Sequence, residues 1–436
     1  MFGKFEIIKK CSTTNARVSS LQLSNSSLSL PIFMPVGTYG AMKAVTVDNI
    51  KENMILSNTY HLRNLGKNIK NFMKYKQNML TDSGGFQIGS LPDVVVEEEG
   101  VKFFDKMFTP EESMDIQITL GADIIMQLDE VVNPNDDIEK IEVASKRSIR
   151  WLDRCIKQVY YNKLDEEENI NKDNNKLDVK DNNKLDVKDR NKLDVKDNNI
   201  SNDKNTVDLK DNIENNTKRL KRDNDLIIKL DKSSKQILFP IVTGGLSEEL
   251  RQYSIDEILK RKPKGLAIGG LSGGEEKSEF ARTVLYCTNN LPDNIPRYIM
   301  GVGYPEDIVV CVSLGTDMSD CVYPTRTARF GRLFSDKGDI LINNKLQYEI
   351  NKNEECGCST CTNYSYAYLS LIKGTTNFCM LATEHNLYYM RNLTKRIREA
   401  ILEDKYPEFI KEYMNKKYKV IPEWIVEIMK KFNIKL

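Results

Sequence analysis

Three aspartates stand at or near the ends of short apolar segments. Asp82 lies in Leu80-Thr-Asp-Ser-Gly-Gly-Phe-Gln87, Asp129 in Gln127-Leu-Asp-Glu130, and Asp320 in Ser319-Asp-Cys-Val-Tyr-Pro-Thr-Arg326. An acid flanked by apolar residues is costly to bury unless it is paired or functional. Two carboxyl groups that face a glycosidic bond can divide the work, because one attacks the anomeric carbon while the other exchanges protons with the leaving and entering groups.

The residues after Asp82 favour a ligand site. Gly84 and Gly85 would let a ligand approach the backbone closely, and Phe86 could cover a planar ligand from one side. The alternative is structural, because Asp82 or Ser83 could cap the start of a helix.

Three arginines, Arg326, Arg329 and Arg332, follow the third acid directly. The guanidinium fork suits phosphates and base edges, so these cations beside the acids suggest a nucleic-acid substrate. The alternative is a set of surface arginines without a partner. A Lys-rich stretch with Tyr and Trp, Lys411 to Lys431, is expected to be an ordinary amphipathic helix, with an RNA platform as its alternative.

Cys356, Cys358, Cys361 and His385 have the spacing C-x-C-x2-C-x23-H. Three thiolates and one imidazole complete a tetrahedral zinc shell, and a shell with no position left for water is structural. The alternatives are buried or redox cysteines and an ordinary core histidine.

The composition sets outer limits. The 436 residues include 64 Lys+Arg against 63 Asp+Glu, a net charge of +1, which excludes a uniformly basic, histone-like protein but leaves a local basic patch possible. No apolar run approaches the roughly 18 residues of a membrane span, and the first residues lack the apolar stretch of a secretory signal. Nine cysteines, an odd number, argue against a disulfide framework, so a cytoplasmic protein is expected.

Residues 164–235 differ from the rest, because Asn, Lys and Asp dominate and the segment NKLDVKDN recurs in tandem. So few apolar side chains cannot offset the entropy of ordering the chain, so a disordered insertion is expected.

The acids must be positioned by the remaining sequence, which contains eight short apolar runs alternating with helix-like stretches such as Pro110–Leu120, Leu246–Arg261 and Glu275–Asn290. The runs are Phe33–Gly37, Met54–Asn58, Met79–Asp82, Asp123–Asp129, Leu238–Thr243, Leu266–Gly269, Tyr298–Gly301 and Met318–Tyr323. This alternation predicts an α/β fold, a (β/α)8 TIM barrel whose site forms at the carboxyl ends of the strands. A doubly wound sheet would need a phosphate-binding GxGxxG, which the chain lacks after its early strands.

The expected division has four parts. Residues 1–163 and 236–335 form the barrel, 164–235 the insertion, and 336–436 a zinc-binding subdomain with C-terminal helices.

Separated motifs of the chain match one known family. The matching stretches are Met34–Gly40, Ser57–Leu62, Leu80–Gln87, Gly121–Asp129, Gly265–Glu275, Met300–Gly303, Asp320–Gly331 and the Cys-His set. In these stretches the chain resembles the tRNA-guanine transglycosylases, most closely the catalytic subunits of the eukaryotic, queuine-inserting members. The resemblance implies a TIM barrel with a structural Zn2+ site and exchange of guanine at the anticodon wobble position of tRNA for queuine or a related 7-deazaguanine.

The resemblance also implies roles for single residues. Asp320 would be the nucleophile that holds the RNA covalently, and Asp82 the general acid/base. Residues of the base pocket would be Ser83, Gly84, Gly85, Phe86, Asp129, Thr243, Gly269, Gly270, Gly273 and Met300. Residues that grip the tRNA would be Thr325, Arg326, Thr327, Ala328 and Arg329.

Two positions refine these expectations. Bacterial members carry a bulkier residue at the position of Gly273, so the extra room would admit the cyclopentenediol arm of queuine. Thr243 stands where family members place Gln, and its shorter side chain offers a single hydroxyl.

Family members pair with a second subunit, which implies a homodimer or a heterodimer with a homologous subunit. A non-catalytic tRNA-binding partner subunit of such an enzyme is the alternative function, and a zinc-dependent RNA-binding module without activity is a third.

Overall fold

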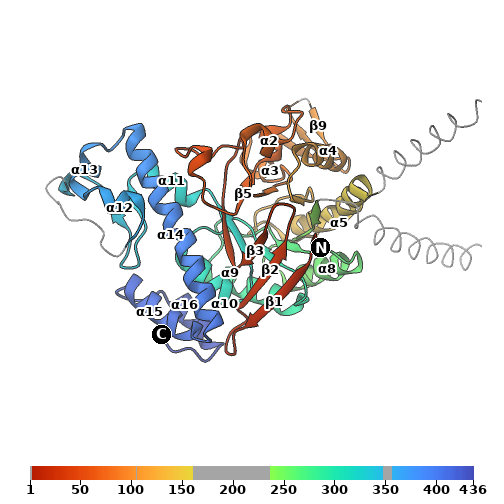
Figure 1. The fold of residues 1–436 in the computed structure, drawn as a ribbon. Coiled ribbons are helices and arrows are strands. Elements are labelled where there is room, and N and C mark those ends of the chain that lie inside the picture. Colours follow the sequence, from red (N-terminus) through yellow and green to blue (C-terminus); the bar gives the residue numbers. More distant parts are fainter. Residues whose placement is uncertain (1, 105, 161–235, 347–355) are drawn as a thin grey trace, which may run out of the picture. The chain divides into compact units, whose positions relative to one another are not determined.

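The computed structural model describes residues 2–104, 106–160, 236–346 and 356–436, so the expected insertion at 164–235 lies outside the described residues (Figure 1). The centre of the described chain consists of parallel strands in two sheets, with the orders β11-β10-β6-β5 and β12-β13-β14-β15-β4. These strands are β4 (Ile32–Pro35), β5 (Met54–Ser57), β6 (Asn78–Thr81), β10 (Ile124–Met126), β11 (Ile237–Phe239), β12 (Ile241–Val242), β13 (Leu266–Ile268), β14 (Arg297–Ile299) and β15 (Met318–Cys321). Each of the eight apolar runs contains a strand, which confirms the α/β prediction.

The parallel strands are short and apolar because most of their residues are buried on both faces. All residues of β5, β6, β10 and β13 are buried. Parallel strands covered on both faces are near-continuous apolar runs rather than alternating ones. Side chains such as Met34, Leu80, Met126, Phe239 and Tyr298 join one core cluster that spans both sheets.

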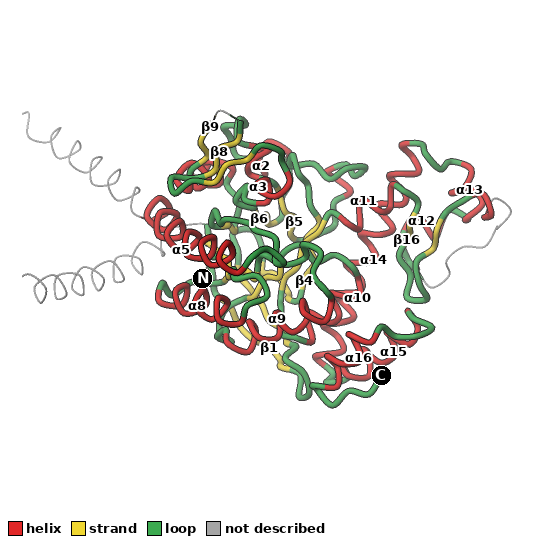
Figure 2. Tube along the Cα trace, turned by 180° about the vertical axis from the view of Figure 1, so that it is seen from behind, coloured by secondary structure: helices red, strands yellow, loops and turns green. Residues whose placement is uncertain are grey.

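Helices connect the strands as the sequence predicts. The connecting helices are α4 (Pro110–Leu120), α5 (Ile138–Tyr160), α8 (Glu248–Lys260), α9 (Lys277–Asn290) and α10 (Pro305–Ser313). Thr109 and Ser247 cap α4 and α8 by accepting backbone N–H groups, and Pro110 occupies the first turn of α4, where no N–H partner is needed. α9 packs against α8 and α10, and the succession of these helices can be followed from behind in Figure 2.

Further elements, which the sequence did not predict, lie at the amino ends of the parallel strands and beside the site. The antiparallel strands are β1 (Phe5–Lys10), β2 (Arg17–Gln22), β3 (Ser27–Leu30), β7 (Val94–Val96), β8 (Val101–Phe103), β9 (Lys106–Phe108), β16 (Arg332–Leu333) and β17 (Ile340–Leu341). The short helices of the first part are η1 (Val47–Asn49), α1 (Thr59–Leu62), α2 (Ile69–Met73) and α3 (Phe86–Ser90). Leu21, Leu28 and Leu30 of the β1–β3 sheet belong to the same core cluster as the parallel strands.

The C-terminal part is helical around one long helix. Its elements are α11 (Tyr323–Arg329), η2 (Asn344–Leu346), α12 (Ser359–Asn363), α13 (Tyr366–Leu371), α14 (Thr376–Leu402), α15 (Tyr406–Lys417) and α16 (Glu423–Lys430). α14 packs against α11, α12, β4 and the β1–β3 sheet, beside which it lies in Figure 1. The stretch Lys411–Lys431 therefore holds the end of one helix and all of the next rather than a single helix, and Tyr413 is buried. None of the described helices is both long and apolar enough to span a membrane.

A buried ion pair joins the amino-terminal sheet to the parallel strands. Arg17 donates from Nη2 to Asp317 at 2.6 Å and from Nε at 2.9 Å, and both side chains are at most 2% exposed. Asp317 directly precedes β15 and also accepts the backbone N–H of Arg297 at 2.8 Å. The pair therefore closes the amino ends of the strands, opposite the ends that carry the candidate site.

Replacing Arg17 tests this closure. Arg17→Met should lower the free energy of unfolding by about 3–5 kcal/mol, because the Asp317 carboxylate stays buried without its cation. The midpoint of urea unfolding would measure the loss, with Lys4→Met, at an exposed pair with Glu6, as the matched control. Equal midpoints for Arg17→Met and the control would contradict it.

Candidate active site and metal centre

Asp82 follows β6 and is held by the residues that follow β5. Its Oδ2 accepts the Asn58 amide at 2.5 Å, and its Oδ1 accepts the Thr59 N–H at 2.9 Å and the Gly84 N–H at 3.3 Å. The Thr59 hydroxyl also donates to the backbone carbonyl of Asp82. The three hydrogen bonds to Oδ1 and Oδ2 fix the orientation of the Asp82 side chain at this end of the parallel strands. The helix-cap alternative does not describe Asp82, because α3 begins at Phe86 without a side-chain cap.

Asp320 belongs to β15 and has a different set of partners. Its Oδ1 accepts the Tyr298 hydroxyl and, at 3.0 Å, the Gly301 N–H, both from β14 and the loop after it. Among the described residues no partner contacts Oδ2. Asp320 is thus anchored through one oxygen and presents the other.

Asp129 completes the group of acids. It is 3% exposed, and a Cβ at Gly85 would lie 3.0 Å from both its carbonyl oxygen and its Oδ1. A side chain at residue 85 would therefore crowd the Asp129 loop, and glycine lets the Asp82 loop pack closely on it. The structure therefore brings the three predicted acids together from β6, β10 and β15.

Burial shifts the pKa of each acid in the same direction. Desolvation raises the pKa of Asp82 to about 7, against the hydrogen bonds from Thr59, Gly84 and Asn58, and the charge of Asp320 raises it further. Desolvation raises the pKa of Asp129 to about 7, with added repulsion from Glu130 and Asp82. The pKa of Asp320 is also raised by burial, while the Gly301 and Tyr298 hydrogen bonds lower it. Carboxyl groups with pKa values near neutrality are suited to proton transfer.

The strand ends beyond Asp129 supply backbone groups and one unpaired hydroxyl. Thr243 is buried, and its Oγ1 has no hydrogen-bond partner among the described residues. Arg251 of α8 is fully buried and donates to the carbonyl oxygens of Val242 at 2.8 Å and Gly269 at 2.7 Å. Met300 lies beside Gly269, since a Cβ there would be 3.2 Å from its sulfur. The Arg251 guanidinium therefore links the end of β12 to the loop after β13.

Gly273 lies close to another loop rather than beside open space. A Cβ at Gly273 would be 2.8 Å from Pro134 Cδ, and its carbonyl accepts the Asn133 amide at 3.2 Å. A larger residue would have to displace the loop between β10 and α5.

The remaining predicted residues are arranged on helices at the edge of the site. Phe86 begins α3 and is 67% exposed, free to cover a ligand. In α11, Arg326 is exposed, whereas Arg329 is half-buried and donates to the Thr325 carbonyl at 2.7 Å. Thr325, Thr327 and Ala328 are buried, so their side chains support the helix instead of facing solvent.

Four residues that hold the site were not assigned roles from sequence. Asn58 and Thr59 lie in a family motif, Ser57–Leu62, which was a signal without a role. Tyr298 begins an apolar run and looks like an ordinary core residue, and Arg251 lies in a charged helix with no distinguishing pattern. Their roles depend on strands far apart in the chain.

The Cys-His residues form a compact cluster, as the spacing predicts. Their four ligand atoms lie within 4.8 Å of one another, and His385 Nδ1 is 3.6, 3.4 and 3.2 Å from the sulfurs of Cys356, Cys358 and Cys361. A tetrahedral zinc shell would place sulfur and nitrogen roughly 3.5 Å apart. His385 Nε2 lies 2.8 Å from the Phe334 carbonyl, to which its N–H donates. The lone pair of the ring is therefore on Nδ1, the nitrogen that faces the three sulfurs. The donor set and its geometry can hold one metal ion.

Taken together, parallel strands with buried carboxyl groups at their carboxyl ends, next to a Cys3His cluster, define an α/β enzyme with a metal-binding segment. The chain belongs to the queuine tRNA-ribosyltransferase family, whose model matches residues 11–174 and 195–419. It is 36% identical to the queuine tRNA-ribosyltransferase catalytic subunit of Schizosaccharomyces pombe, over 99% of this chain and 98% of that protein. It is 33% identical to the catalytic subunit of Caenorhabditis elegans, over 97% of each chain. The queuine tRNA-ribosyltransferase of a Thermoanaerobacter species is 35% identical, over 95% of this chain and 97% of that protein.

Metal analysis and the substitution of one ligand test the cluster. Elemental analysis of the purified protein should find about one metal ion per chain, and Cys358→Ser should lower the melting temperature and the metal content together, because a shell of four protein ligands contributes to folding. Cys379→Ser, at a half-buried cysteine outside the cluster, is the matched control. Protein without metal, or a Cys358→Ser variant as stable as the control, would contradict the assignment.

Proposed function

We propose that the protein is a tRNA-guanine transglycosylase, which exchanges guanine at the wobble position of tRNA for queuine or a related 7-deazaguanine. The observation that carries the proposal is the pairing of Asp82 and Asp320 at the carboxyl ends of β6 and β15, each oriented by different groups. The relatives are named queuine tRNA-ribosyltransferases, and two buried acids at strand ends would serve this chemistry.

Hydrogen bonding assigns the two acids to different steps. Asp320 Oδ2 carries no partner among the described residues, so its electron pair is available to attack the ribose C1′ as the C1′–N9 bond to guanine breaks. Asp82, with a pKa raised to about 7, donates the proton that the departing guanine takes up. Asp82 then takes a proton from the incoming base, whose nitrogen attacks C1′ and releases the Asp320 carboxylate. Two displacements at one carbon retain its configuration.

The remaining pocket residues bind the base. Phe86 would stack on the ring, and Asp129 would accept hydrogen bonds from its Watson–Crick edge. The buried Thr243 hydroxyl, unpaired among the described residues, would gain a partner from a bound base. Ser83, Gly84, Gly85, Gly269, Gly270 and Met300 would form the walls, and Gly273, whose Cβ position is closed by Pro134, would join them through its backbone.

We further propose that the parallel strands close into one (β/α)8 barrel. A parallel bridge between Val36 and Leu56 links the strands β4 and β5, and Pro240 alone separates β11 from β12, so the two sheets meet at both edges. Residues 1–163 and 236–335 would form this barrel, and residues 336–436 would carry structural zinc, which four Cys and His ligands favour. Pairing with a copy or a homologous subunit, and a cytoplasmic location, fit a tRNA-modifying enzyme.

A non-catalytic partner subunit is the alternative function. It would not need two carboxyl groups oriented in this way, so Asp82 and Asp320 favour the enzyme.

The nucleophile is tested by base exchange. Wild-type protein should incorporate labelled guanine or queuine into tRNA and form a covalent RNA adduct that survives denaturation. Asp320→Asn should form no adduct and exchange at least a thousandfold more slowly, since an amide oxygen is a poor nucleophile. Exchange by Asp320→Asn at the wild-type rate would refute the assignment, and an inactive wild type would favour the partner-subunit alternative.

Proton transfer by Asp82 predicts a pH dependence. Guanine release in a single turnover needs protonated Asp82, whose pKa is about 7, so the rate should fall about tenfold for each pH unit above that value. Below the raised pKa of Asp320 the rate should fall again, because the nucleophile must be ionised. Rapid-quench measurements would record the profile, and Asp256→Asn, an exposed change on α8, should leave it unaltered. A rate that stays constant from about pH 7 to 9 would rule out Asp82 as the acid.

A further inference from the structure

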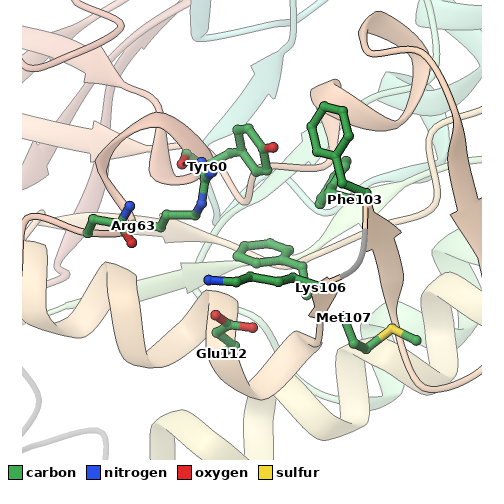
Figure 3. Close-up of a pocket in the computed structure, with 9 residues that line it drawn as sticks. Tyr60, Arg63, Phe103, Lys106, Met107 and Glu112 are labelled. Atoms are coloured by element: carbon green, nitrogen blue, oxygen red, sulfur yellow. Dashed lines mark hydrogen bonds between the residues drawn. The ribbon is translucent and has the colours of Figure 1, made fainter.

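A second cavity, of about 360 Å³, lies beside the Asp82 loop and is not used by the proposed chemistry. We call it the Tyr60 pocket. Its lining comes from α1 and the two residues after it, the strands β8 and β9 with Phe104, and the first turn of α4 (Figure 3). A cavity of this size is large enough for a small organic ligand or one nucleotide.

The floor of the pocket is aromatic. The rings of Tyr60 and Phe103 meet edge to face with centroids 4.6 Å apart, and Phe108 lies 5.9 Å from Phe103 and 6.3 Å from Tyr60. All three side chains are buried, which makes the floor rigid. At the rim, Phe104 is 64% exposed with φ +55°, an uncommon conformation for a bulky residue. An exposed ring held in this way is available to stack on a ligand.

Cations stand at the rim. The Arg63 guanidinium stacks on the Tyr60 ring at 4.0 Å and donates from Nη1 to the Tyr60 carbonyl at 2.6 Å, and the side chain is otherwise exposed. Lys106 is exposed and has neither a hydrogen bond nor an ion pair within the described chain. Figure 3 shows its ammonium extending between Arg63 and Glu112. Among the described residues that line the pocket, two cations stand against one carboxylate over an aromatic floor, and cations beside aromatic rings are the combination that binds single-stranded RNA.

The pocket shares a wall with the candidate active site. Tyr60 follows Thr59, which holds Asp82, and a Cβ at Gly84 would be 3.2 Å from the Phe108 ring and 3.3 Å from Tyr60 Cβ. The pocket lies on the β6 side of the site, while Arg326 and Arg329 lie on the β15 side. β5 and β4 lie between these two strands, a separation of about 14 Å at the usual strand spacing. Arg63 follows β5 and Lys106 follows β6, so both cations lie on the other side of β4 from the strand that precedes α11.

We propose that the Tyr60 pocket binds a nucleotide of the RNA substrate that flanks the exchanged one, on the side opposite to Arg326 and Arg329. Arg63 and Lys106 bind its phosphate, and Phe104 stacks on its base. The inference rests on the proposed function for the identity of the RNA, whereas binding of RNA at the pocket is measurable without base exchange.

The test uses the full-length protein and an anticodon stem-loop RNA. The Kd is measured by fluorescence anisotropy over a range of salt for wild type and Arg63→Ala/Lys106→Ala. The double variant should bind about tenfold or more weakly, and the slope of log Kd against log salt should fall by roughly 1 to 2, because two phosphate contacts are lost. The KM for the free base and the kcat at saturating RNA should not change.

Matched variants separate this role from a structural one. Lys102→Ala removes an exposed cation from β8 that does not line the pocket, and should bind RNA like wild type. Phe104→Asn tolerates the same backbone conformation without the ring. In separate RNAs, the fluorescent base 2-aminopurine is placed on each side of the wobble position. Phe104→Asn should abolish its quenching on one of the two sides and leave it unchanged on the other.

The outcomes separate the two hypotheses. If wild type exchanges base while the double variant keeps the wild-type Kd and salt slope, the pocket assignment is overturned and the proposed function stands. If the double variant loses RNA affinity but wild type exchanges no base, RNA binding at the pocket is upheld and the proposed function fails.

Discussion

The site depends on keeping two carboxyl groups buried and still able to ionise. Removing them from water costs free energy, and the rest of the site must offset this cost. Desolvation raises the pKa of both Asp82 and Asp320, so each needs hydrogen bonds from elsewhere in the chain to remain ionisable near neutral pH. Asp82 obtains three donors from the residues after β5 and from its own loop. Asp320 obtains two, both on one oxygen. This difference in partners supports the proposed roles of Asp82 as the proton carrier and Asp320 as the nucleophile.

The scaffold explains how these donors stay in place. At the amino ends of the strands, the buried pair of Arg17 and Asp317 ties the β1–β3 sheet to β14 and β15. At the carboxyl ends, Arg251 joins the loops after β12 and β13 through their carbonyl oxygens. Both guanidinium groups are buried because each satisfies several acceptors at once, which one ammonium group does less well.

The metal cluster has a structural connection to the residues expected to grip RNA. His385 contacts the Phe334 carbonyl, and its neighbour Asn386 donates to the carbonyls of Pro324 and Arg332 and accepts the Phe334 N–H. These contacts fix the first turn of α11, the helix that carries Arg326 and Arg329, and the strand β16 that follows it. A four-ligand cluster thus supports, from outside the parallel strands, the segment that is proposed to grip RNA, and a metal held by all four ligands would leave no position for substrate.

The sequence alone determined the eight parallel strand segments, several helices, the three acids and the Cys3His set, because these depend on local apolar runs, spacing and motifs. It could not identify Tyr298, Arg251 or Asn58 as partners of the site, since each acts on a residue or loop from a different strand. It also missed the β1–β3 sheet, which precedes the alternation of strands and helices, and the β8–β9 hairpin, whose strands of three residues each carry little pattern of their own. Which oxygen of Asp320 stays free, and that an aromatic pocket adjoins Asp82, were decided only by tertiary structure. Both follow from side chains brought together across strands, and no spacing along the chain encodes that proximity.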